Sequence, residues 1–94
     1  MSQLIWSTTF VRATKRLLHC HPELQAKLAA ALRLLAQDPF HPALHSHKLK
    51  GDLAGVWACT VDYDMRILFE FVQAPESGDQ DVLLLTVGTH DEVY

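Results

Sequence analysis

Residues that together could act on a phosphodiester are concentrated in the second half of the sequence. His47 begins a short basic segment, Asp64 lies at a predicted turn, and His90 follows the last apolar run. Cleavage of RNA without a metal ion needs a base that takes the proton of the ribose 2′-hydroxyl and an acid that protonates the departing 5′-oxygen. Histidine suits both roles because its pKa lies near neutrality.

The same region supplies cations for the negative charge that develops on the phosphoryl group. Arg66 could bind phosphate oxygens in a bidentate way, and Lys48 and Lys50 stand just before a glycine turn. Tyr94 could stack on a base, as aromatic side chains do when they recognise single-stranded RNA. The predicted catalytic residues are His47, Asp64, His90 and Arg66, and the predicted substrate-binding residues are Lys48, Lys50 and Tyr94.

Each of these residues also has a simpler structural explanation. The two histidines could be ordinary exposed side chains, and the two lysines could protect an edge strand from aggregation. Asp64 fits a hairpin turn, where aspartate is favoured, and Arg66 could pair with Glu70 on the same face of a strand. No residue is specific by itself, so the prediction depends on their convergence on one face of the fold.

A metal site is the other arrangement of side chains to consider. His19 with His21 forms one histidine group, and His41, His45 and His47 form another. The first pair flanks a helix break, the second group lies in a loop with prolines, and the sequence has no CxxC or HExxH pattern. We therefore expect no metal ion and no cofactor.

The composition indicates one small domain without a strongly basic character. The chain has 94 residues and a formal net charge of -3, which argues against a general nucleic-acid-binding protein. All eight Lys and Arg residues lie at or before Arg66, whereas several acidic residues lie after it. A local basic face is therefore compatible with the acidic total.

The sequence also indicates a cytoplasmic protein that does not bind a membrane. It has no apolar run long enough to span a bilayer, and its first residues lack the basic-then-apolar pattern of a secretory signal. Cys20 and Cys59 lie in apolar patterns, so we expect buried thiols. A disulfide between them is possible, but cytosolic thiols are normally reduced.

The first half of the chain predicts a strand followed by a helical hairpin. Residues 4–6 form a short apolar run, and the hydroxyls of residues 7–9 can cap a helix over residues 10–19. Pro22 ends that helix and suits the first turn of the next one. The second helix is expected to end at Asp38, because a residue before proline avoids the helical conformation.

The second half changes from a helical to an alternating apolar period. After a loop at residues 39–46, we predict strands over residues 56–63 and 66–72, joined by a turn at residues 63–65. Residues 81–87 are apolar on both faces, which is typical of a central strand. The core face of the first two strands is predicted to carry Trp57, Cys59, Val61, Tyr63, Ile67, Phe69 and Phe71.

These elements predict an α+β fold in a single domain over residues 1–94. The N-terminal strand and the helical hairpin would pack on a mainly antiparallel sheet of four to five strands, which makes two layers. The first strand would join the sheet by a crossover over the helices. The face opposite the helices carries Thr60 and Arg66 and is expected to remain open, where a ligand could bind.

Three patterns along the chain are similar to a known family. They are His47-x-Leu49-x-Gly51-x3-Gly55-x-Trp57, Val61-x2-Asp64-x-Arg66-Ile67-Leu68-Phe69, and Val87-Gly88-Thr89-His90-x3-Tyr94. The chain resembles the RelE/ParE toxin superfamily over nearly its whole length. Within that superfamily it is most similar to the YafQ-like mRNA interferase toxins of type II toxin–antitoxin systems.

The resemblance implies a two-layer RelE/ParE-like fold and a metal-independent endoribonuclease that cuts mRNA, typically on the ribosome. It also implies a cognate antitoxin that silences the toxin, with operator DNA bound only through that antitoxin. By this resemblance His47, Asp64 and His90 match catalytic positions, and Tyr94 matches a terminal aromatic residue. Arg66 matches the arginine of an Arg-[Ile/Leu]-x-[Phe/Tyr] strand.

Two positions depart from the YafQ-like pattern. A family histidine falls at Thr60, and a nearby aspartate falls at Ala58. A weaker nuclease, a different acid–base arrangement, and a degenerate copy kept for antitoxin binding are all compatible with these changes. A ParE-like toxin, which acts by binding DNA gyrase rather than by cutting RNA, is a further alternative.

Overall fold

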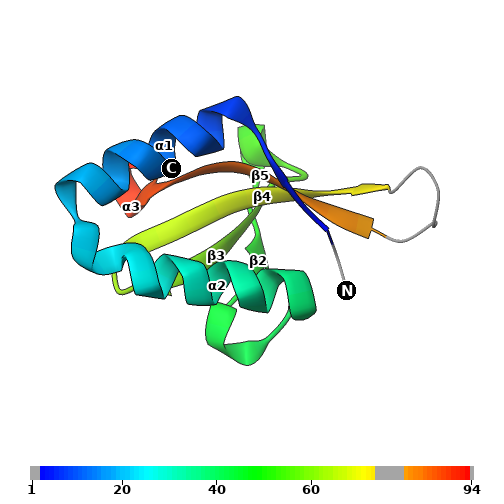
Figure 1. Ribbon diagram of the computed structural model, residues 1–94. Helices are drawn as coiled ribbons and strands as arrows, with labels where there is room; N and C mark the ends of the chain where they lie inside the picture. The colour runs from blue at the N-terminus through cyan, green and yellow to red at the C-terminus, as the bar shows by residue number, and fades with distance from the viewer. Residues whose placement is uncertain (1–2, 74–79, 94) are drawn as a thin grey trace.

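A computed structural model describes residues 3–73 and 80–93, except for the side chains of His90 and Glu92. The two long helices run in opposite directions across the sheet (Figure 1). The helices and strands are β1 (Leu4–Trp6), α1 (Thr8–Cys20), α2 (Gln25–Gln37), β2 (His47–Lys48), β3 (Trp57–Asp62), β4 (Met65–Gln73), β5 (Gln80–Thr89) and α3 (His90–Val93). Single 3-10 turns lie at Pro22–Leu24, Pro42–Leu44 and Gly51–Leu53.

The strands form one five-stranded sheet in the order β1-β5-β4-β3-β2. β1 pairs with β5 in parallel, and the other neighbours are antiparallel. The chain therefore begins at one edge of the sheet, passes through the helical hairpin, and resumes at the opposite edge as β2. The predicted α+β fold and the interior position of the strand that contains residues 81–87 are confirmed.

The start of α1 is tied to both the helix and the sheet through Ser7. Its Oγ accepts a hydrogen bond from the Phe10 backbone amide at 3.0 Å. The same hydroxyl donates to the carbonyl of Leu85 at 3.2 Å, and the Ser7 backbone amide donates to Leu84 at 3.3 Å. The predicted hydroxyl cap is therefore this serine, and it also joins α1 to β5.

We expect Ser7→Ala to lower the free energy of unfolding by about 0.5–2 kcal/mol, the usual cost of losing a helix cap. Urea unfolding followed by circular dichroism would measure the change. Thr9→Ala, on the exposed side of the first helical turn, is the matched control and should not lower stability. Equal losses in the two variants would show that the Ser7 hydroxyl has no special role.

The core lies between the helical hairpin and one face of the sheet. Its fully buried members include Phe10 and Leu35 from the helices and Ile67, Phe69 and Leu84 from the strands. Alternation predicted this face correctly for β3 and β4, except at Tyr63. That residue is 94% exposed, because β3 ends at Asp62 and Tyr63 lies in the turn that follows.

The two cysteines differ from each other, and the prediction of two buried thiols is wrong for one of them. Cys59 is buried in the core, where burial raises the pKa of its thiol to about 12. Cys20 is exposed at the end of α1, and both cysteines are free thiols. The apolar pattern placed Cys20 on the correct side of the helix, but α1 ends there, so no further turn of α1 covers the side chain.

The face of the sheet opposite the helices is less open than predicted. Ala58 on β3 is 0% exposed and Leu68 on β4 is 5% exposed, and they are paired across the two strands. Neither residue belongs to the core cluster under the helices. α3 folds back against β4 and β5. No helix in the described part of the chain is both long and apolar enough to cross a membrane.

Candidate functional site

His47 is the first residue of the edge strand β2, and the segment before it determines its orientation. His41 Nδ1 accepts a hydrogen bond from the Ala43 amide at 3.1 Å, which opens the short 3-10 turn at Pro42–Leu44. His45 then ends that turn in the left-handed conformation, with φ of 49°. This residue turns its carbonyl toward the exposed side chain of His47.

His47 Nδ1 lies 3.1 Å from the carbonyl oxygen of His45. A carbonyl oxygen can only accept, so the proton of this hydrogen bond belongs to Nδ1. In the neutral imidazole the other nitrogen, Nε2, is then the one that can accept a proton. Sequence reasoning selected His47 but could not find this contact, which depends on the backbone conformation of His45.

The strand pairing places His47 and Arg66 on the same face of the sheet, opposite the helices. His47 pairs with Ala58, and Thr60 pairs with Arg66, so their side chains share a face. The two Cα atoms are separated by two strand spacings and two residues along a strand, which corresponds to about 12 Å. Between them lie the buried methyl group of Ala58 and the half-buried side chain of Thr60.

Lys48 does not share this face, so the predicted residues do not all converge. It pairs with Trp57, and its Nζ lies 5.5 Å from the centre of the Trp57 ring, on the side of the sheet that carries the helices. Lys50 is exposed in the turn after β2, next to Gly51. Gly51 has a φ of 71°, which favours glycine and turns the chain toward β3.

Arg66 fixes the turn between β3 and β4. Its Nη1 donates hydrogen bonds to the carbonyls of Asp62 at 3.0 Å, Tyr63 at 3.2 Å and Met65 at 3.1 Å. These carbonyls, and not the carboxylate of Glu70, are its partners. Lys27 on α2 secures the same turn from the other side through a 2.9 Å contact with Asp62. That hydrogen bond holds the pKa of the Asp62 carboxyl below its usual value.

We expect Arg66→Ala to lower the free energy of unfolding by about 1–2 kcal/mol, because three turn carbonyls lose a charged donor in a partly solvated position. Thermal or urea unfolding would measure this loss. Arg33→Ala removes an exposed arginine from α2 and should change stability by no more than about 0.5 kcal/mol. An Arg66→Ala protein as stable as the parent would contradict the assigned role in the turn.

Asp64 is exposed in the turn that Arg66 secures. The next residue, Met65, pairs with Thr89, and His90 directly follows Thr89. The backbones of Asp64 and His90 therefore lie at the same end of β4 and β5. The side chain of His90 and the whole of Tyr94 lie outside the described residues, so the roles predicted for them stay predictions.

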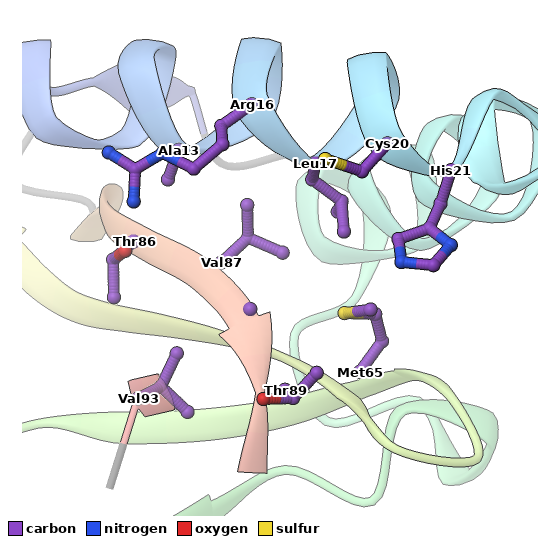
Figure 2. A pocket seen from close by; sticks show the side chains of 11 residues that line it. Ala13, Arg16, Leu17, Cys20, His21, Met65, Thr86, Val87, Thr89 and Val93 are labelled. Carbon is purple, nitrogen blue, oxygen red and sulfur yellow. The ribbon is translucent and has the colours of Figure 1, made fainter. Parts of the chain in front are cut away.

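A pocket of about 390 Å³ lies elsewhere, between α1 and the end of β5. Figure 2 shows Arg16, Leu17 and Cys20 directed into it from α1, with Met65 on the opposite wall. Of the predicted site residues whose side chains the structure describes, namely His47, Lys48, Lys50, Asp64 and Arg66, none lines this pocket. The described residues contain no group of three or more His, Cys, Asp or Glu side chains that could hold a metal ion.

Comparisons with known proteins agree with the fold. A family model for the bacterial toxin of type II toxin–antitoxin systems, YafQ, matches residues 2–94. No protein of curated function matches the sequence significantly.

Among solved structures, YafQ from E. coli strain BL21(DE3) has a TM-score of 0.80 at 18% identity, covering 100% of this chain and 99% of that chain. A chain of the E. coli DinJ–YafQ complex has a TM-score of 0.78 at 20% identity, with coverage of 100% and 99%. A YoeB/ParE toxin from Agrobacterium tumefaciens has a TM-score of 0.75 at 18% identity, with coverage of 94% and 98%. These neighbours share the two-layer fold described above.

Proposed function

This chain belongs to the YafQ family of bacterial toxins of type II toxin–antitoxin systems, and we propose that it is a metal-independent endoribonuclease that cleaves mRNA. The observation that carries the proposal is the orientation of His47. Its Nδ1 donates to the His45 carbonyl, and Nε2 is left to take a proton. This is the arrangement that a general base requires.

In the proposed reaction, Nε2 of His47 takes the proton of a ribose 2′-hydroxyl. The resulting 2′-oxygen attacks the adjacent phosphorus, and the bond from phosphorus to the 5′-oxygen breaks. A protonated group gives its proton to that 5′-oxygen, and we assign this role to His90, with Asp64 as a carboxylate that orients it. The products are a 2′,3′-cyclic phosphate and a free 5′-hydroxyl.

Arg66 and Lys50 are the cations that we assign to the phosphate in the transition state. The three hydrogen bonds of Arg66 to described residues all start from Nη1, so we assign the other two guanidinium nitrogens to phosphate oxygens. The turn contacts would hold the guanidinium in place before the substrate arrives, which lowers the cost of reorganisation during the reaction. Lys50, exposed beyond β2, would contact a neighbouring phosphate.

The test is induced expression in growing bacteria, followed by primer extension on abundant transcripts. The proposal expects growth arrest together with discrete new 5′ ends inside translated regions. Growth arrest without new ends would overturn the nuclease assignment and favour a ParE-like mode. In that case a DNA supercoiling assay with purified gyrase would show inhibition.

A catalytically degenerate toxin that only binds its antitoxin is the second candidate. It is favoured by the neutral side chains of Ala58 and Thr60, which occupy the face between His47 and Arg66. A methyl group transfers no proton, and a hydroxyl is a poor acid or base near neutral pH. Expression without any growth arrest and without RNA cleavage would support this candidate.

The partners that we propose follow from the family and from the site. E. coli YafQ occurs in a complex with DinJ, and we propose that a cognate antitoxin binds this chain in the cytoplasm. We also propose mRNA on the ribosome as the substrate, and contact with operator DNA only through the antitoxin. Co-expression of that antitoxin should abolish the growth arrest.

A further inference from the structure

Three aromatic side chains and one lysine form a small cluster near the β2 edge of the sheet, on the side that carries the helices. The Phe40 ring lies 5.6 Å from Phe71 in a stacked arrangement and 5.4 Å from Trp57 in an edge-on arrangement. Trp57 and Phe71 are themselves 5.4 Å apart, and Lys48 Nζ lies 5.5 Å from the Trp57 ring centre. We call Phe40, Trp57, Phe71 and Lys48 the edge cluster.

Phe40 is the exposed member of the edge cluster. It is 58% exposed, whereas Trp57 and Phe71 are partly buried and pack against the core. One face of the Phe40 ring stacks on Phe71 with an angle of 28° between the planes, and Trp57 meets the ring in an edge-on arrangement. From the 58% exposure of the residue we infer that the ring face away from Phe71 is open to solvent. Trp57 and Phe71 already contact each other and the core without it, so the core does not explain why this position carries an aromatic ring.

Phe40 is held in place by the turn that follows α2. Asp38 Oδ1 accepts a hydrogen bond from the Phe40 amide at 3.0 Å, and the Asp38 carbonyl accepts one from His41 at 3.0 Å. Ser46 Oγ donates to the Pro39 carbonyl at 2.7 Å, which ties the turn to the segment before β2. The exposed ring face is thus presented in a fixed orientation, and a fixed platform loses little entropy when a planar group stacks on it.

The edge cluster lies next to the proposed catalytic face. His47 and Lys48 are consecutive residues of β2 whose side chains point to opposite faces. β2 is the outermost strand. An RNA chain that is bound at His47 and passes around this edge of the sheet would therefore meet Lys48 and Phe40 next. Lys48 and Lys50 are both exposed here, which suits a polyanion better than an apolar peptide.

We propose that Phe40 is a stacking platform for a base of single-stranded RNA adjacent to the cleavage site, with Lys48 on the neighbouring phosphate. This inference rests on the proposed nuclease function and adds a second contact region to it. Single-stranded RNA combines unstacked bases with a charged backbone, and aromatic side chains beside cations are its usual binding surface. Stacking on a ring face accepts any base, so the platform contributes affinity rather than sequence preference.

The test is RNA binding by a protein that cannot cleave, with Trp57 as the reporter. His47→Ala keeps the RNA intact, and Trp6→Phe removes the other tryptophan, so fluorescence reports only on Trp57 beside Phe40. The probe is a single-stranded RNA of about ten nucleotides, within the usual site size for such surfaces. On this parent protein, Phe40→Leu keeps apolar bulk but removes the ring face. Phe40→Tyr keeps the ring face.

We expect RNA to change Trp57 fluorescence and Phe40→Leu to weaken binding about 5- to 150-fold, the range measured for loss of one stacked base. Phe40→Tyr should bind within a few-fold of the parent. Unchanged affinity in Phe40→Leu, equal losses in both variants, or no RNA binding by the parent would each overturn the platform. Unchanged RNA affinity together with weaker antitoxin binding would instead identify a protein interface and would also overturn it.

Failure of the nuclease proposal is separable from failure of this inference. A chain with unchanged His47 that binds RNA in a Phe40-dependent way but does not cleave it would remove the nuclease assignment and keep the platform. A chain that cleaves RNA and whose affinity does not depend on Phe40 would keep the nuclease and remove the platform. Circular dichroism melting of each variant shows whether the fold is intact.

Discussion

Replacement of His47 by alanine is expected to slow RNA cleavage about 10²- to 10⁴-fold, which is the usual contribution of one general base. The 3.1 Å hydrogen bond from Nδ1 to the His45 carbonyl leaves Nε2 to take the proton in the proposed reaction, and alanine has no group that can replace it. Stability should be nearly unchanged, because the side chain is exposed. Single-turnover cleavage of an end-labelled RNA, with and without ribosomes, would measure the rate.

His19→Ala is the matched control for this variant. His19 is an exposed histidine on α1, far from β2 in the fold, so its removal should leave the cleavage rate unchanged. Added imidazole should restore part of the activity of His47→Ala, since the missing function is a proton acceptor. If His47→Ala cleaved as fast as the His19→Ala protein, His47 could not be the base.

Phe69→Ala should give the largest loss of stability, about 3–5 kcal/mol, as is usual when a buried phenylalanine is truncated. Phe69 is 0% exposed on β4, pairs with Trp57 on β3 and Leu84 on β5, and packs edge-on against Phe71 at 5.5 Å. Its removal leaves a cavity between the central strands and the helices. The total free energy of unfolding of a native protein is about 5–15 kcal/mol. Urea unfolding should therefore show a large fall in the urea concentration at which half of the protein is unfolded.

Phe40→Ala is the appropriate comparison, because it removes the same ring from an exposed position. It should lower the free energy of unfolding by less than about 1 kcal/mol, because the contacts of the Phe40 ring with Phe71 and Trp57 are partly solvated. A similar loss in both variants would mean that Phe40 supports the core after all. It would also weaken the reasons for regarding that ring as a binding surface.

The helices and the core face of the strands could be predicted because local chemistry determines them. Ser7 caps α1, Pro22 opens the segment that leads to α2, and Asp38 with Pro39 ends it. The burial of Ala58 and Leu68 could not be predicted in this way. Alternation tells which side of a sheet a residue occupies but not how completely its neighbours cover that side.

The candidate site could be predicted as a set of residues but not as an arrangement. The strand β2 has only two residues, so its pairing register cannot be predicted from an alternating pattern. That register places Lys48 and His47 on opposite faces of the sheet. The three turn carbonyls bound by Arg66 come close only because the hairpin turns tightly. The orientation of His47 depends on the left-handed backbone of His45. Few non-glycine residues adopt this conformation, and although histidine is one of the enriched types, the sequence does not show which histidine will do so.

The pairing of β1 with β5 bears on when the fold is completed during synthesis of the chain. These strands come from opposite ends of the chain, and the hydrogen bond from the Gln3 amide to Asp81 joins residues 78 positions apart. Contacts so distant form late, because the intervening chain must first be ordered. A ribosome still translating this message therefore carries helices and a partial sheet. The complete five-stranded sheet therefore forms only after the last strand has left the exit tunnel.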